Sequence, residues 1–119
     1  MKIAVTSMGT DLDAELDPRF GRAQYVLILD SDGTVLEAID NSANRNAMRG
    51  AGIQAAKIIA DRQVEVLLTG HCGPNAFRTL QAAGVKIGSE QNGTVREALA
   101  RLNRGEISFA ESADVEGHW

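Results

Sequence analysis

Short runs of apolar residues separated by polar stretches dominate the first part of the chain. Residues 2–6, 25–30 and 35–40 form three such runs, rich in β-branched and aliphatic side chains. Runs of this length bounded by polar residues predict β-strands. Asp32-Gly33 lies between the second and third runs, and an Asp-Gly pair in that position is a strong hairpin signal. We therefore expect these two strands to be antiparallel neighbours.

The spacing of apolar residues becomes helical further along, and it predicts three helices, at residues 53–62, 74–83 and 94–103. Pro74 suits the first turn of the second helix, and Gly84 follows its end. In the third helix Thr94 is followed three residues later by Glu97, which predicts a capping box. Continuous apolar runs at residues 64–69 and 85–88 lie between the helices and predict two further strands.

The resulting order is β-β-β-α-β-α-β-α, which predicts an α/β protein with a mixed five-stranded sheet and helices on its faces. We expect the first, fourth and fifth strands to be parallel and the hairpin to extend one edge, as in a ribonuclease H-like arrangement. A chain of 119 residues is long enough for one domain. We assign residues 1–108 to this domain, and residues 109–119 to a flexible acidic tail.

The amino-acid composition mainly excludes some classes of binding partner. The net charge of -4 argues against nucleic acid or an anionic membrane as the partner, although local donors can still bind a small anion. No run approaches the roughly 20 apolar residues that span a membrane, and the N-terminus lacks the apolar region of a secretory signal. Cys72 is the single cysteine, which fits a reducing compartment, so we expect a cytoplasmic protein. One cysteine also falls short of the four thiolates that usually hold an iron–sulfur cluster.

The segment from Thr69 to Asn75 carries the most informative chemistry. There a predicted buried strand ends, a glycine-containing loop follows and a helix begins. The first N–H groups of a helix lack partners within it and carry partial positive charge, so this junction favours an anion. Gly70 and Gly73 allow a ligand to approach the backbone closely. The alternative is an ordinary strand–helix loop, in which the glycines serve only the turn.

His71 and Cys72 lie in this loop, and both side chains can bind soft or borderline metals. For Cys72 the alternative is a small buried apolar residue, and for His71 a loop histidine satisfied by the backbone. Their spacing falls short of those that identify a zinc site. We treat both as candidate metal ligands, and Gly70, Gly73 and Asn75 as candidate contacts of the bound group.

A second junction between loop and helix, Gly50-Ala51-Gly52, is preceded by Arg45 and Arg49. If both helix starts lie on the same rim of the sheet, the two arginines join Gly50 and Gly52 in one anion site. The alternative is that the arginines are solvated loop residues.

A third segment, Asp17-Pro18-Arg19-Phe20-Gly21-Arg22, contains two more cations. Arg19 can either face an anion or pair with Asp17, and both alternatives stay open. Phe20 is expected to pin the loop to the core. We expect the acidic residues around this segment to form a solvated loop face rather than a metal site; they are Asp11, Asp13, Glu15 and Asp17.

These three segments resemble those of the dinitrogenase iron–molybdenum cofactor biosynthesis family, which includes the NifX-like proteins and the C-terminal region of NifB. The resemblance rests on residues 17–23, 50–56 and 69–76, and it spans most of the chain. It implies a ribonuclease H-like fold and the binding or transfer of metal–sulfur clusters. The length and single-domain build are similar to those of the orange-protein subgroup, whose members hold a molybdenum–copper sulfide cluster non-covalently.

This sequence differs from the family pattern at two points, and both change what the resemblance implies. Arg49 stands where many members carry histidine, so a metal ligand is exchanged for a positive charge that suits an anion. With one cysteine, the chain lacks the radical-SAM cysteine triad of full-length NifB. The resemblance therefore implies a non-catalytic carrier of an anionic metal–sulfur cluster, with protein partners for delivery. The cluster is a molybdenum–copper sulfide or an iron–molybdenum or iron–sulfur cofactor precursor.

Two other functions stay open. A regulatory or protein-interaction module would need no metal. A nuclease-type enzyme of ribonuclease H-like fold needs several carboxylates around two metal ions, and residues 2–7 of the first strand contain none. We therefore expect that the protein is not an enzyme.

Overall fold

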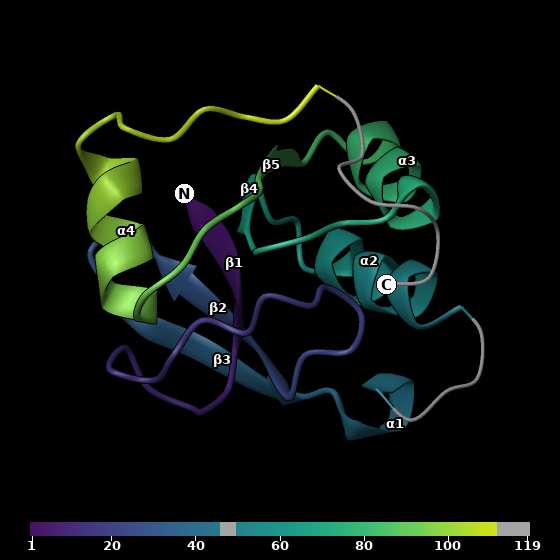
Figure 1. Ribbon diagram of the computed structural model, residues 1–119, viewed down its shortest axis with the longest axis horizontal. Helices are drawn as coiled ribbons and strands as arrows, with labels where there is room; N and C mark the ends of the chain where they lie inside the picture. Colours follow the sequence, from purple (N-terminus) through teal and green to yellow (C-terminus); the bar gives the residue numbers. More distant parts are fainter. Residues whose placement is uncertain (46–49, 112–119) are drawn as a thin grey trace.

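A mixed five-stranded sheet runs through the middle of the protein, in the order β3-β2-β1-β4-β5 (Figure 1). This structure is a computed structural model, and it describes residues 1–45 and 50–111. The strands are β1 (Lys2–Ser7), β2 (Tyr25–Asp30), β3 (Val35–Asp40), β4 (Val66–Leu68) and β5 (Lys86–Gly88). The α/β class and the mixed sheet that the sequence predicted are both confirmed.

The directions of the strands follow from their connections. β2 pairs antiparallel with β1 and with β3, and the Asp32-Gly33 turn joins β2 to β3 as predicted. β1, β4 and β5 are parallel to one another, because helices return the chain to the same end of the sheet before each new strand. The carboxyl ends of these three strands therefore meet at one edge of the sheet, next to the loops that follow Ser7, Leu68 and Gly88.

In the described residues, four helices accompany the sheet: α1 (Ser42–Arg45), α2 (Ala51–Asp61), α3 (Pro74–Ala82) and α4 (Val95–Asn103). The three longer ones lie where apolar spacing predicted them. The one-turn helix α1 was not predicted, since its four residues are too few to show a helical pattern. Asp40 Oδ1 accepts the Ser42 backbone N–H at 2.9 Å just before this turn.

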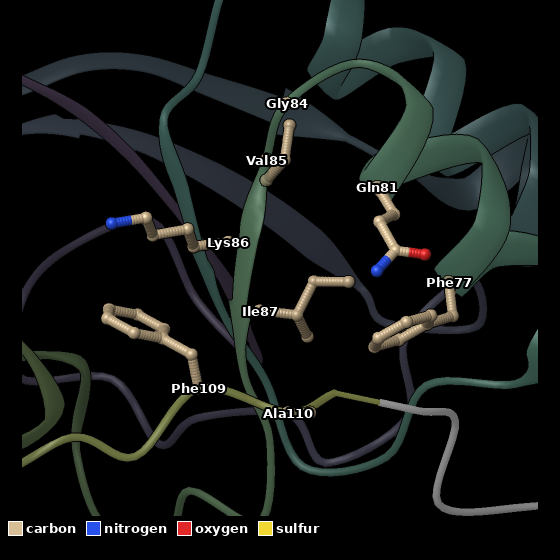
Figure 2. Close-up of a pocket in the computed structure, with 8 residues that line it drawn as sticks. All are labelled: Phe77, Gln81, Gly84, Val85, Lys86, Ile87, Phe109 and Ala110. Carbon is tan, nitrogen blue, oxygen red and sulfur yellow. The ribbon is translucent and has the colours of Figure 1, made fainter.

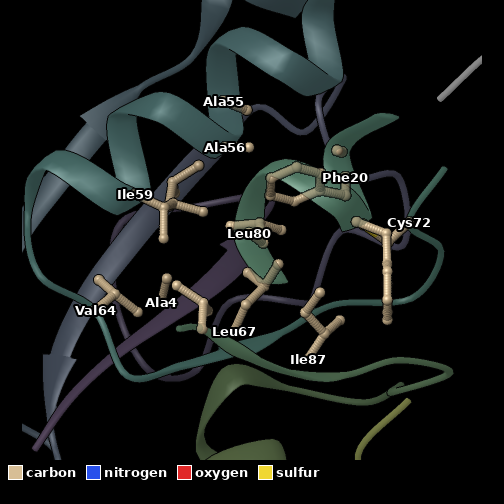
Figure 3. Packing of buried hydrophobic residues seen from close by; sticks show 14 of the residues in the cluster. Ala4, Phe20, Ala55, Ala56, Ile59, Val64, Leu67, Cys72, Leu80 and Ile87 are labelled. Carbon is tan, nitrogen blue, oxygen red and sulfur yellow. The ribbon is translucent and has the colours of Figure 1, made fainter. Parts of the chain in front are cut away.

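The inner strands β1, β2 and β4 are buried on both faces, whereas the edge strand β3 is largely exposed. α2 and α3 lie side by side over one face, on the right in Figure 1, and α4 covers the other. Because side chains alternate along a strand, Ala4 packs toward α2 and α3, whereas Ile3 and Val5 pack toward α4. Figure 3 shows the first of these two clusters, in which Ile59 of α2 and Leu80 of α3 meet the strand residues.

The segment after α4 returns along the outer edge of β5. The Ala110 backbone N–H donates to Ile87 O at 2.7 Å, and Lys86 Nζ lies 5.5 Å from the centre of the Phe109 ring. A cavity of about 250 Å³ separates this segment from the end of α3 (Figure 2), and its lining includes Phe77 and Gln81. Residues 109 and 110, which we assigned to the tail, therefore lie against the sheet, and residues 112–119 lie outside the described residues.

Within residues 1–45 and 50–111, no helix is both long enough and apolar enough to cross a membrane.

The predicted capping box is present at the start of α4. Thr94 Oγ1 accepts the Glu97 N–H at 3.1 Å, and the Glu97 side chain accepts the Thr94 N–H at 2.9 Å. These contacts lower the pKa of the Glu97 carboxyl, with the backbone hydrogen bond at Thr94 as the largest cause. The capping box thus satisfies the Thr94 and Glu97 N–H groups, while the Val95 and Arg96 N–H groups donate to Ala14 O and Leu12 O.

We predict that Thr94→Ala lowers the free energy of unfolding by about 1 kcal/mol, because it removes the hydroxyl that caps α4. Urea denaturation followed by circular dichroism measures the loss. Thr94→Ser keeps the hydroxyl and should stay within a few tenths of the wild-type value. Equal losses in both variants would contradict the capping role.

Candidate functional site

The loop at residues 17–22 and the loop at residues 69–75 lie side by side and form a short parallel bridge. The backbone of Arg19 pairs with the backbone of His71 as an isolated parallel β-bridge. The His71 N–H donates to Pro18 O at 2.7 Å, and the Phe20 N–H donates to His71 O at 3.1 Å. The loop after β1 is thereby joined to the loop after β4, although more than fifty positions separate them in the sequence.

Two glycines let the backbones approach closely enough for this arrangement. A Cβ at Gly70 would lie 2.5 Å from Pro18 Cα, and a Cβ at Gly21 would lie 2.7 Å from Gly52 Cα. Gly21 also has a φ of +90°, which side chains disfavour. Residues 17–23 therefore touch the start of α2 at one end and the loop before α3 at the other. We call residues 17–23, 50–54 and 70–75 the rim segments.

The bridge determines which way each side chain points. Paired residues of adjacent strands present their side chains on the same face, and their neighbours point to the opposite face. Phe20 and Cys72, the next residue on each strand, are 0% and 1% exposed and belong to the core cluster between the sheet and α2 and α3 (Figure 3). Arg19 and His71 are half-buried on the other face. The anchoring role expected for Phe20 is confirmed.

This alternation bears directly on Cys72 as a candidate metal ligand. Its side chain is buried, and its Sγ contacts the Gly73 carbonyl oxygen at 3.8 Å. The structure therefore favours the alternative that we left open, a small buried residue of the core. Among residues 1–45 and 50–111, no group of three or more His, Cys, Asp and Glu side chains is placed to hold a metal ion.

Buried polar side chains fix the first rim segment at both ends. At its start, Asp17 accepts the backbone N–H groups of Arg19 at 3.1 Å and Gln24 at 3.2 Å. At its end, Asn41 Nδ2 donates to the carbonyl oxygens of Gly21 and Ala23, at 3.1 and 2.9 Å. The loop is therefore held by specific hydrogen bonds and not only by apolar packing.

Our prediction that Asp17 belongs to a solvated acidic face was wrong, since its side chain is 0% exposed. The sequence did contain a signal. An Asp at the start of a turn commonly accepts the backbone N–H two residues later, and Asp17-Pro18-Arg19 fits that pattern. Asp11, Asp13 and Glu15 are exposed, as expected.

The two helices at the rim begin without side-chain caps. Gly50 precedes α2 and Gly73 precedes α3, neither start has a side-chain cap hydrogen bond, and neither first turn holds an acidic residue. Helix α4, with Thr94 and Glu97, is the opposite case. The first N–H groups of α2 and α3 therefore keep their partial positive charge for another anionic partner.

The remaining predicted residues divide into three groups. Asn75 is exposed in the first turn of α3, where its side chain accepts a hydrogen bond from Arg78. Arg45 ends α1, and nothing is described of its side chain. Arg49 lies outside the described residues. The structure thus brings together Arg19, Gly50, Gly52, Gly70, His71, Gly73 and Asn75 on three joined segments.

The donors described in this arrangement are of the kind that would suit an anion. Its donors are backbone N–H groups at two helix starts and the guanidinium of Arg19, which is 38% exposed. The carboxylate of Asp17, the acidic member of these segments, is buried and already accepts hydrogen bonds from the loop. A negatively charged group at the rim would therefore meet positive partial charges on a protein whose overall charge is negative.

Comparisons with known proteins identify similar sequences and folds. In a search of solved structures, the apo form of the orange protein from Desulfovibrio gigas is 43% identical, with 96% of each chain covered and a TM-score of 0.91. A NifB-like protein from Thermotoga is 34% identical, with 98% of each chain covered and a TM-score of 0.81. An uncharacterized protein of Methanocaldococcus jannaschii is 24% identical over 93% of this chain and 97% of its own length.

A family model described as "Dinitrogenase iron-molybdenum cofactor" matches residues 1–105, which include all three rim segments. This match agrees with the resemblance that those segments suggested. The chain belongs to the dinitrogenase iron–molybdenum cofactor family.

Proposed function

We propose that the protein is a non-catalytic carrier of an anionic metal–sulfur cluster, and that the cluster binds at the rim segments. The observation that carries the proposal is the junction of two uncapped helix starts through one loop. Residues 17–23 contact Gly52 of α2 and pair with His71 just before α3. We infer that the partial positive charges of both helix starts and the guanidinium of Arg19 act on the same anion.

The energy of such contacts is sufficient only when several act together. A helix start stabilises an exposed anion by about 0.3–1 kcal/mol, and by up to about 2 kcal/mol when it is partly buried. A hydrogen bond to a charged group adds about 1.5–3 kcal/mol. Micromolar affinity needs about 8 kcal/mol. Two helix starts, Arg19 and one or two further arginines reach this range, whereas a single contact does not.

Family membership supports the identity of the cargo. We infer a molybdenum–copper sulfide cluster, as in the orange-protein subgroup, with an iron–molybdenum or iron–sulfur cofactor precursor as the alternative. The residues fit a sulfide-rich anion, because the rim offers N–H donors to sulfide. His71, on the same face as Arg19, is the candidate direct ligand. Cys72 would have to leave the core to reach the cluster, so we do not include it in the proposed ligand set.

Three further assignments belong to this proposal. We assign the fold to the ribonuclease H-like type, which the strand order β3-β2-β1-β4-β5 supports. Arg45 and Arg49 lie six and two residues before the first residue of α2, so we place them among the anion contacts. A carrier also needs proteins that load and unload it.

The first test is reconstitution of the purified chain with tetrathiomolybdate and copper(I), followed by visible absorption. We expect a charge-transfer band that stays with the protein on gel filtration and weakens at high salt, because charge holds the cluster. His71→Ala and Arg49→Ala should each reduce the retained cluster at least fivefold. Arg104→Ala removes a cation that is paired with Glu106 beyond the end of α4, and it should have no effect.

Failure to retain this cluster or an iron–sulfur precursor would remove the carrier function and leave a regulatory module without metal as the better explanation. Retention that neither His71→Ala nor Arg49→Ala changes would show that the cluster binds elsewhere on the protein.

A second test addresses the junction of the rim segments. Gly70→Ala places a methyl group against the Pro18 backbone. We expect it to lower the free energy of unfolding by about 1–3 kcal/mol and to reduce cluster retention at least tenfold. Gly105→Ala is the matched control, because its φ of +72° makes alanine unfavourable but its Cβ would meet no atom within 4 Å. Equal loss of retention in both variants would mean that only overall stability matters.

A further inference from the structure

A carboxylate that the proposed function does not use lies within the first rim segment. The side chain of Asp17 is 0% exposed, although a carboxylate is costly to bury unless hydrogen bonds and charges compensate it. Its Oδ1 accepts the backbone N–H of Arg19 at 3.1 Å and also lies 3.5 Å from the Nε of the same residue. Asp17 therefore contacts Arg19 through both the backbone and the side chain.

The backbone of Asp17 is fixed against the sheet. Its N–H donates to Thr6 O at 2.9 Å, and its carbonyl oxygen accepts the Thr6 hydroxyl at 2.6 Å. The Thr6 hydroxyl also lies 2.8 Å from that of Thr69, which follows β4. All three residues are 0% exposed. The carboxylate is consequently held in a constant position relative to the carboxyl ends of β1 and β4.

The Arg19 side chain has N–H donors beyond the one that contacts Asp17. A guanidinium carries five N–H groups, and the contact with Asp17 engages the one at Nε. The side chain is 38% exposed and shares a face with His71 through the backbone bridge. An arginine held at Nε can offer its terminal N–H groups to an anion in a constant orientation, as in bidentate recognition.

We propose that Asp17 is a positioning residue of the anion site, which holds the Nε side of Arg19 so that the terminal N–H groups face an anion beside His71. This inference rests on the proposed function and deepens it. It opposes the simpler electrostatic expectation that a carboxylate next to Arg19 weakens anion binding by cancelling the charge of the arginine. The two expectations predict opposite effects when the charge of Asp17 is removed.

The test is titration of the full-length chain with tetrathiomolybdate, followed by visible absorption at constant salt. We expect Asp17→Asn and Arg19→Gln each to weaken binding about tenfold, which corresponds to about one hydrogen bond to a charged group. The double variant should bind no more weakly than Arg19→Gln alone, because Asp17 acts through Arg19. A merely structural role would not produce this non-additivity. Asp13→Asn breaks an exposed pair with Arg96 of α4, and it should leave the affinity unchanged.

Arg19→Lys keeps the test decisive if Asp17→Asn does not fold. Lysine retains the charge but lacks the planar guanidinium, so we expect it to bind within threefold of Arg19→Gln. Wild-type affinity in Arg19→Lys, unchanged or tighter binding in Asp17→Asn, or additive losses in the double variant would each overturn the inference alone. A wild-type chain that does not bind tetrathiomolybdate would overturn this inference, whereas a chain that retains neither the molybdenum–copper cluster nor an iron–sulfur precursor would overturn the proposed function as well.

Discussion

The arrangement of the site depends on the short backbone bridge between Arg19 and His71. Two hydrogen bonds and a close contact at Gly70 hold together the loops that follow β1 and β4. Since α3 begins two residues after Cys72, the bridge also fixes where the first turn of that helix lies relative to residues 17–23. Without it, the arginines and the helix starts would belong to separate loops at the same edge of the sheet.

The rim combines a rigid base with helix starts that carry no side-chain caps. The loops are held in place by buried hydrogen bonds of Asp17, Asn41 and the Thr6–Thr69 pair. The helix starts of α2 and α3 have no side-chain caps of their own. A preorganised set of donors pays less ordering entropy when a ligand arrives. The overall charge of -4 is compatible with this, because short-range donors dominate at contact distance and salt screens the more distant carboxylates.

Local signals in the sequence were enough for the five strands and the three longer helices. The Asp32-Gly33 turn, the capping box at Thr94 and the apolar runs each act over a few residues, so the strands, the three long helices and the hairpin could be predicted. Features that depend on distant contacts were harder. The roles of His71 and Cys72 differ because Arg19 pairs with one of them, and the burial of Asp17 depends on how its loop packs against β1. No local pattern indicates the first fact, and Asp17-Pro18-Arg19 indicates a turn but not how deeply its carboxylate is buried.

The edges of the sheet have a consequence for the behaviour of the protein at high concentration. Along β5, the backbone N–H of Ala110 already donates to the carbonyl oxygen of Ile87. Along β3, the pairing with β2 is interrupted by a bulge at Ile28/Leu29. Glu37 of β3 also forms an ion pair with Arg62. Bulges, charges and covering segments are the features that keep strands of neighbouring molecules from adding to a sheet. The two edges of the described sheet therefore resist the addition of strands from neighbouring molecules.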